Sequence, residues 1–109
     1  MLNGQAFLQG HVEIIHDNVW GTICDNWFND NSANVICRMA GYGNGVYNYG
    51  RYKQTSATKA TKIWLSYLVC PGDKTNIIGC THKPWGQHQC GHHEDVGVRC
   101  YGKLLLDII

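Results

Sequence analysis

Apolar and polar side chains alternate along residues 10–24, with a polar interruption of His, Asp and Asn at residues 16–18. Alternation with a period of two is typical of strands with one buried face, and the three polar residues favour a turn between them. The pattern therefore predicts a β-hairpin. Its apolar positions are Val12 and Ile14 in the first strand and Val19, Trp20 and Ile23 in the second.

The hydrophobic period changes after the hairpin. Apolar residues then recur at the spacing of one helical face, at Ala33, Ile36, Cys37 and Ala40. Asp30 or Ser32 can cap the start of this segment, and Gly41 suits the left-handed position that follows a helix. We expect one amphipathic helix of about ten residues, with Cys37 directed inward.

The remaining patterns are weaker. Residues 41–50 contain four glycines and three tyrosines without a clear period, which predicts a surface loop stiffened by aromatic contacts. Residues 62–65 and 95–100 have the composition of strands. The last apolar run, residues 104–109, is far shorter than the ~20 residues of a membrane span and contains Asp107, so we expect no membrane insertion by this chain.

Size and cysteine content indicate the class of protein. A chain of 109 residues makes one domain, and its six cysteines include no Cys-x-x-Cys pair. An even cysteine count without that pair indicates a disulfide framework and an oxidising, extracellular compartment rather than a structural zinc site. Spacing alone does not choose among the fifteen possible pairings, although a local bridge between Cys70 and Cys80 fits their short separation. No leader pattern is present, so we expect an excised ectodomain.

Six motifs follow one another in a recognisable order. They are GHVEI (10–14), VWGTICD (19–25), ANVICRMAGY (33–42), IWL (63–65), WGQHQC (85–90) and HEDVGVRC (93–100). Together they resemble the scavenger receptor cysteine-rich domain, and six cysteines rather than eight are similar to its group A form. On this resemblance the chain divides into a lead-in (1–9), the domain (10–101) and a tail (102–109).

The resemblance implies an α+β fold, in which a curved antiparallel β-sheet wraps around one α-helix. It also implies which cysteines are paired. The implied disulfides are Cys24 with Cys90, Cys37 with Cys100, and Cys70 with Cys80.

Two segments depart from the family pattern. The family usually has two acidic residues, a glycine and a tryptophan after the first cysteine, whereas this chain has Asp25, Asn26, Trp27 and Phe28. Many members carry one or two aspartates where this chain has Ser66 and Tyr67. The departures leave fewer carboxylates and argue against a second metal position.

Asp25, Asn26 and Glu94 form a candidate cation site. The implied Cys24 to Cys90 bridge would bring their two loops together, and Ca²⁺ prefers carboxylate and amide oxygens. Three side chains are few for calcium, so we expect a weak site with a dissociation constant of roughly 10⁻⁴ to 10⁻³ M. The alternative is that Asp25 and Glu94 cap turns or pair with Arg99.

Basic residues are segregated in the middle of the chain. No Asp or Glu occurs between Asp30 and Asp73, whereas Arg38 and the four candidate ligand-binding residues Arg51, Lys53, Lys59 and Lys62 lie there. On a shared face, these cations would attract sulfated glycans, microbial surface polymers or other polyanions. An ordinary solvated surface is the alternative. No motif for sequence-specific nucleic-acid binding is present.

Other chemistries have little support. A zinc site at His88, Cys90, His92 and His93 would need a reduced Cys90, which the disulfide framework excludes. The chain lacks GxSxG, HExxH and phosphate-loop motifs, so we expect no enzyme activity. The sequence therefore predicts an extracellular module that recognises polyanionic or protein ligands with help from Ca²⁺. The alternative is a structural or regulatory protein-interaction module of a larger secreted enzyme, such as a protease or an amine oxidase.

Overall fold

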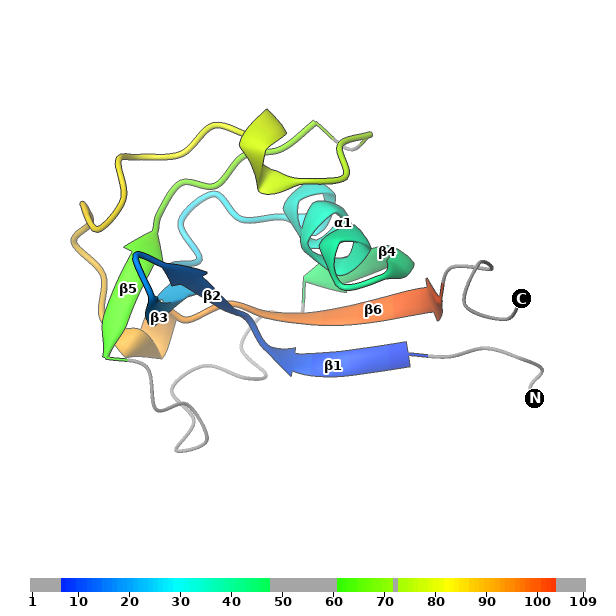
Figure 1. Ribbon diagram of the computed structural model, residues 1–109, viewed down its shortest axis with the longest axis horizontal. Coiled ribbons are helices and arrows are strands. Elements are labelled where there is room, and N and C mark those ends of the chain that lie inside the picture. Colours follow the sequence, from blue (N-terminus) through cyan, green and yellow to red (C-terminus); the bar gives the residue numbers. More distant parts are fainter. Residues whose placement is uncertain (1–6, 48–60, 72, 104–109) are drawn as a thin grey trace.

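The computed structural model describes residues 7–47, 61–71 and 73–103 (Figure 1). Seven regular elements appear in these ranges, joined by the short 3₁₀ turns η1 (Ile77–Gly79) and η2 (His92–Glu94). They are β1 (Phe7–His11), β2 (Glu13–His16), β3 (Val19–Ile23), α1 (Asp30–Met39), β4 (Tyr42–Tyr47), β5 (Lys62–Leu65) and β6 (Gly97–Lys103).

The described strands form two three-stranded sheets. One is antiparallel, in the order β1-β6-β4, and the helix α1 packs against it (Figure 1). The other has the order β2-β3-β5, in which β3 and β5 run parallel. The predicted class, a disulfide-stapled α+β domain with strands around one helix, is confirmed, with the strands divided between two sheets.

The hairpin is confirmed. Asp17 and Asn18 connect β2 to β3 with φ of 52° and 63°, the paired left-handed conformation of a type I′ turn. Of the apolar residues in β3 only Ile23 is buried, whereas Trp20 remains 54% exposed. Ile15 of β2 lies opposite Trp20 and is 52% exposed, so this pair occupies the solvent face of the hairpin.

The helix is confirmed over Asp30–Met39, but its predicted cap is wrong. Asn29 is the N-cap, because its Oδ1 accepts from the backbone N–H groups of Asn31 and Ser32 at 3.0 and 3.3 Å. Ser32 is turned inward and donates its hydroxyl to the Leu68 carbonyl at 2.8 Å. Gly41 follows the helix with φ of 91°, as expected.

The predicted loop at residues 41–50 is wrong over its first part. Tyr42–Tyr47 forms strand β4 between the helix and β6, and residues 48–50 lie outside the described residues. Glycine weakens strand propensity, yet here it permits close packing, since a Cβ on Gly45 would collide with Cys37 Sγ. The Asn34 side chain holds the strand by accepting from the Gly45 N–H at 2.8 Å.

All three implied disulfides are present. Cys24–Cys90 and Cys37–Cys100 join residues 66 and 63 positions apart, whereas Cys70–Cys80 closes a loop of 10. The Cys37–Cys100 bridge fastens the helix to the central strand of the antiparallel sheet. Its two cysteines belong to a buried core that also contains Ile23, Val35, Leu65 and Val96.

We predict that removing the long-range bridge costs more stability than removing the local one. Loop-closure entropy gives roughly 4 kcal/mol for a loop the size of Cys37–Cys100 and roughly 2.7 kcal/mol for Cys70–Cys80. Urea unfolding of the two double alanine variants measures the difference. Equal losses of unfolding free energy would contradict this account.

Candidate functional site

The Cys24–Cys90 disulfide joins the loop after β3 to the loop before β6. Backbone hydrogen bonds run alongside it, from Asp25 N–H to the Glu94 carbonyl at 2.9 Å and from Val96 N–H to the Ile23 carbonyl at 2.9 Å. Asp25 and Glu94, which are distant in sequence, are therefore fixed next to each other by their main chains.

The side chains of the three candidate cation ligands make different contacts in these loops. Glu94 Oε1 accepts from the Gly91 N–H at 3.0 Å, and Asp25 Oδ2 accepts from the Tyr47 hydroxyl at 3.4 Å. Asn26 Nδ2 donates to Cys90 Sγ at 3.6 Å. Glu94 thus closes the turn at η2, as the capping alternative expects, while a bound cation stays a prediction.

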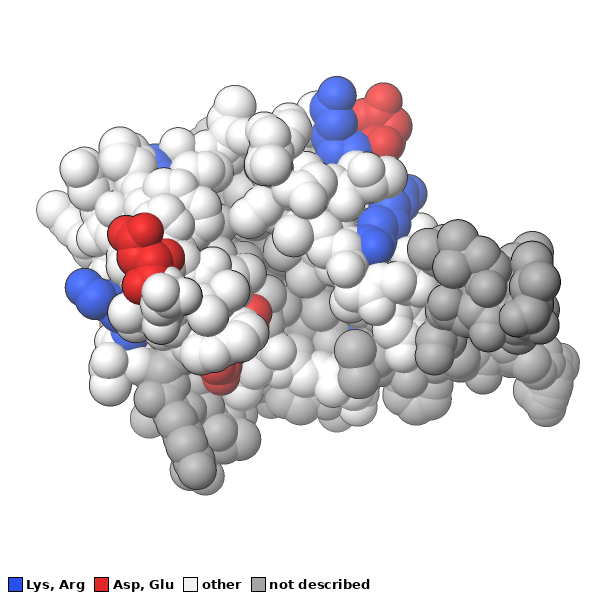
Figure 2. Space-filling view, viewed as in Figure 1, with Lys and Arg blue, Asp and Glu red and all other residues white. Residues whose placement is uncertain are grey.

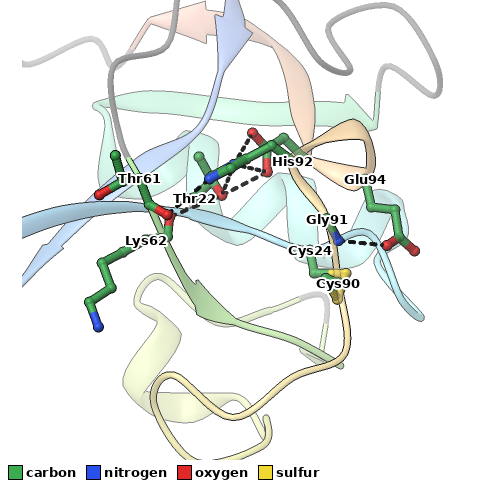
Figure 3. Close-up of polar contacts among 9 residues, drawn as sticks. Thr22, Cys24, Thr61, Lys62, Cys90, Gly91, His92 and Glu94 are labelled. Carbon is green, nitrogen blue, oxygen red and sulfur yellow. Dashed lines mark hydrogen bonds and ion pairs between the residues drawn. A yellow bond between two sulfur atoms is a disulfide. The ribbon is translucent and has the colours of Figure 1, made fainter.

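Sulfur does not provide a metal site here. Cys24 Sγ, Cys90 Sγ and a Glu94 carboxylate oxygen lie within 4.8 Å of one another (Figure 3). Both sulfurs are shared in one disulfide, so neither is the thiolate that zinc requires. His88 Nδ1 is also engaged, because it accepts from the Cys90 N–H at 3.0 Å.

Only one of the four candidate ligand-binding cations can be placed. Arg51, Lys53 and Lys59 lie outside the described residues. Lys62 is exposed at the start of β5, with Nζ 5.2 Å from the centroid of the Trp64 ring. It lines a groove of about 300 Å³ with His88, Cys90 and other residues of this loop. Lys and Arg are sparse on the face drawn in Figure 2.

A buried polar network behind the disulfide was not anticipated from the sequence. Asp95 is completely buried and accepts from the Thr22 hydroxyl at 2.7 Å. His92 Nδ1 lies 2.9 Å from Asp95 Oδ2, and His92 Nε2 donates to the Thr61 carbonyl at 3.1 Å. The network links Thr22 of β3, Thr61 just before β5, and the turn η2. The sequence signal for this network was the i,i+3 spacing of His92 and Asp95. Thr22 lies 73 positions from Asp95, so no local pattern predicts their contact.

This network raises the pKa of His92 above its ordinary value. Burial alone lowers that pKa by disfavouring the charged ring. The hydrogen bonds with Asp95 and with the Thr61 carbonyl, together with the charge of Asp95, outweigh burial because both ring nitrogens face acceptors. Folding therefore stabilises the imidazolium form of His92 relative to the unfolded chain.

A protein-family model matches most of the chain. The model described as the scavenger receptor cysteine-rich domain covers residues 2–101. Among solved structures, the dimeric form of this domain from mouse MARCO is 37% identical, with a TM-score of 0.75 over 87% of this chain and 88% of the other. The third such domain of murine neurotrypsin is 30% identical, with a TM-score of 0.63 over 84% of each chain.

Two curated relatives show the same similarity within longer proteins. The macrophage receptor MARCO of Mesocricetus auratus is 39% identical over 84% of this chain, and human CD5 antigen-like is 31% identical over 94%. The chain spans only 18% and 29% of these two relatives, respectively. Within the described residues, no helix has the length and hydropathy needed to cross a membrane.

We predict that His92 makes stability depend on pH. Its folded pKa exceeds the unfolded value of about 6.5, so its contribution is complete below that pH and disappears as pH rises through the higher folded value. His92→Gln should flatten this dependence in urea unfolding between about pH 5.5 and 8.5. It should also cost about 1–3 kcal/mol at low pH, because Asp95 loses a buried partner.

His93→Gln is the matched control, since the His93 side chain is 71% exposed and its Nε2 lies 3.8 Å from Glu94 Oε1, outside the Asp95 network. That variant should retain the wild-type pH dependence. If the unfolding free energy of His92→Gln depends on pH as steeply as that of wild type, the network does not make stability depend on pH.

Proposed function

Because the chain belongs to the scavenger receptor cysteine-rich family, whose domains are extracellular, non-catalytic recognition modules, we propose that it binds polyanionic ligands with help from Ca²⁺. The ligands would be sulfated glycans or microbial surface polymers. The observation that carries this proposal is the fixed juxtaposition of Asp25 and Glu94 beside the Cys24–Cys90 bridge.

The proposed protein ligands are too few for a complete calcium shell, which fits a weakly held cation. Glu94 uses Oε1 to close its turn, and Oε2 makes no hydrogen bond to the described residues. Asn26 directs its amide nitrogen at Cys90 Sγ, which leaves Oδ1 for a cation. With Asp25, these groups supply part of the six to eight oxygens that Ca²⁺ takes, and water completes the shell.

An incomplete protein shell gives the cation a role in ligand binding. Water-occupied positions on Ca²⁺ can be taken by a sulfate, carboxylate or phosphate oxygen of the ligand. Lys62 lines the groove that also contacts Cys90, so an anionic chain lying there would meet further positive charge. Each exposed cation alone adds little binding free energy, because salt screens its charge.

Repetition would strengthen such weak binding. The related proteins are several times longer than this chain, and one related domain has been solved in a dimeric form. We propose that several copies act together in the intact protein, so that the second binding event benefits from a high effective concentration.

The second candidate is a protein-interaction module within a larger secreted protein. Similarity to the third domain of this family in murine neurotrypsin favours it, because that domain is one of several in its chain. The two functions differ in what the isolated domain does. A protein-interaction module needs neither Ca²⁺ nor a polyanion.

We predict saturable calcium binding by the oxidised domain after removal of metal with a chelator. Calorimetric titration should give a dissociation constant of roughly 10⁻⁴ to 10⁻³ M. The Asp25→Asn, Glu94→Gln double variant should show no such heat, because neutral amides replace both carboxylates at nearly the same volume. Asp17→Asn is the control, since Asp17 lies in the hairpin turn with its side chain 82% exposed. Absence of heat from wild type up to millimolar Ca²⁺ would exclude the site.

We also predict that immobilised heparin retains the domain only when Ca²⁺ is present, and less strongly as NaCl is raised. Lys62→Gln should weaken this binding by up to about fivefold, the contribution of one exposed charge. Lys74→Gln is the control, because Lys74 is exposed within the Cys70–Cys80 loop and does not line the groove. If both variants and wild type are retained equally, Lys62 does not contribute to heparin binding and belongs to the ordinary solvated surface.

A further inference from the structure

Two aromatic residues near the candidate cation site have left-handed backbones. Trp27 has φ of 63° and Tyr67 has φ of 58°. This region is unfavourable for bulky L-residues, and such conformations persist where the surrounding structure enforces them, often at functional positions. Trp27 is also 71% exposed, so its ring is not held there by burial.

Trp27 occupies the third position of a tight turn over residues 25–28. The Phe28 N–H donates to the Asp25 carbonyl at 3.0 Å and closes this turn. Positive φ at that position alone is the pattern of a type II turn, which favours glycine. The next residue, Phe28, is buried and packs edge-on against Tyr47, so core packing does not require the indole of Trp27.

Tyr67 is held beside Trp27 by contacts on both sides of it. The Cys24 N–H donates to the Leu65 carbonyl at 2.8 Å, which joins the end of β3 to the end of β5. The carbonyls of Ser66 and Leu68 are engaged by the Lys83 N–H at 3.1 Å and the Ser32 hydroxyl at 2.8 Å.

The rings of Trp27 and Tyr67 lie next to each other, and a cation lies over the Tyr67 ring. Their centroids are 6.1 Å apart and their planes are tilted by 37°. Lys83 Nζ lies 4.7 Å from the centroid of the Tyr67 ring. Within the described part of the chain, no carboxylate forms an ion pair with Lys83. We call Trp27, Tyr67 and Lys83 the aromatic platform.

We infer that the aromatic platform binds one acidic sugar ring of the ligand, a uronate or a sulfated pyranose. The apolar C–H face of a pyranose packs against an exposed indole, and its hydroxyl groups remain solvated at the edge. The ammonium group of Lys83 faces the carboxylate or sulfate, which gives the platform charge complementarity with acidic sugars. This inference rests on the proposed polyanion binding and specifies the ligand as a glycan.

A sugar ring fits this surface better than a protein does. Two tilted rings and one ammonium group provide a small contact area, whereas a stable protein interface buries roughly 1,200–2,000 Å² in total. The turn that presents Trp27 also carries the polar residues Asp25 and Asn26, which suit the hydroxyl rim of a sugar.

The test follows the indole N–H signals of the four tryptophans by NMR during titration with a sulfated heparin tetrasaccharide at saturating Ca²⁺. The signal missing from the Trp27→Gly variant identifies Trp27. We expect that signal to shift saturably, while the Trp20 signal, from a residue 54% exposed on the hairpin, stays in place. Neutral chitotetraose should produce a smaller shift, since it offers no partner to Lys83.

Trp27→Gly should bind the tetrasaccharide roughly 3- to 10-fold more weakly than wild type, with unchanged Ca²⁺ affinity. It should melt no lower than wild type, because glycine readily adopts positive φ, so lost binding cannot be attributed to misfolding. Trp20→Leu is the matched control and should bind normally. Lys83→Gln should remove the preference for the sulfated sugar.

Three results would overturn the inference. Wild-type affinity of Trp27→Gly, or an unshifted Trp27 signal at saturation, would place the sugar elsewhere and leave Ca²⁺-assisted polyanion binding standing. In that case a protein partner becomes the better explanation of the exposed rings. Failure of wild type to bind the tetrasaccharide at all, with or without Ca²⁺, would remove both the inference and the proposed function.

Discussion

The long-range disulfides Cys24–Cys90 and Cys37–Cys100 connect the early elements of the chain to the last strand and the loop before it. A domain of this size buries a limited fraction of its surface, so covalent closure of long loops compensates for a small core. Cys37–Cys100 fixes the helix on the antiparallel sheet, and Gly45 of β4 fits against its sulfur. Packing, topology and the candidate site all depend on these two crosslinks.

The Cys24–Cys90 disulfide also joins two loops that carry polar residues on the outside and a buried polar network on the inside. Asp25 and Glu94 lie toward the outside of the joined loops, whereas Asp95 is sealed beneath them. A buried carboxylate needs full compensation, and Thr22 and His92 provide it with two short contacts. The loop that presents Glu94 is thereby anchored to β3 and to Thr61, the residue before β5.

The exposed part of this region differs from the usual pattern of the family at two places. Trp27 and Tyr67 belong to the two segments where the sequence departs from the acidic residues and glycine of that pattern. Their rings meet at the surface, although their backbones adopt conformations that disfavour bulky side chains. In this chain an aromatic contact surface therefore lies beside the candidate cation ligands Asp25 and Asn26.

The sequence by itself determined the elements that arise from local patterns. Alternation gave the hairpin, the helical period gave α1, and Gly41 marked its end, because each depends on residues close in the chain. The disulfide pairing followed from family resemblance and not from spacing. Only the tertiary structure decided that Asn29 is the helix N-cap, because the Ser32 hydroxyl donates to the Leu68 carbonyl instead. It also decided that the glycine-rich segment β4 is a strand, because β4 pairs with β6. The same holds for the Thr22–Asp95 contact and the Trp27–Tyr67 pair. Each joins residues far apart in sequence, and such contacts form only when the whole chain has folded.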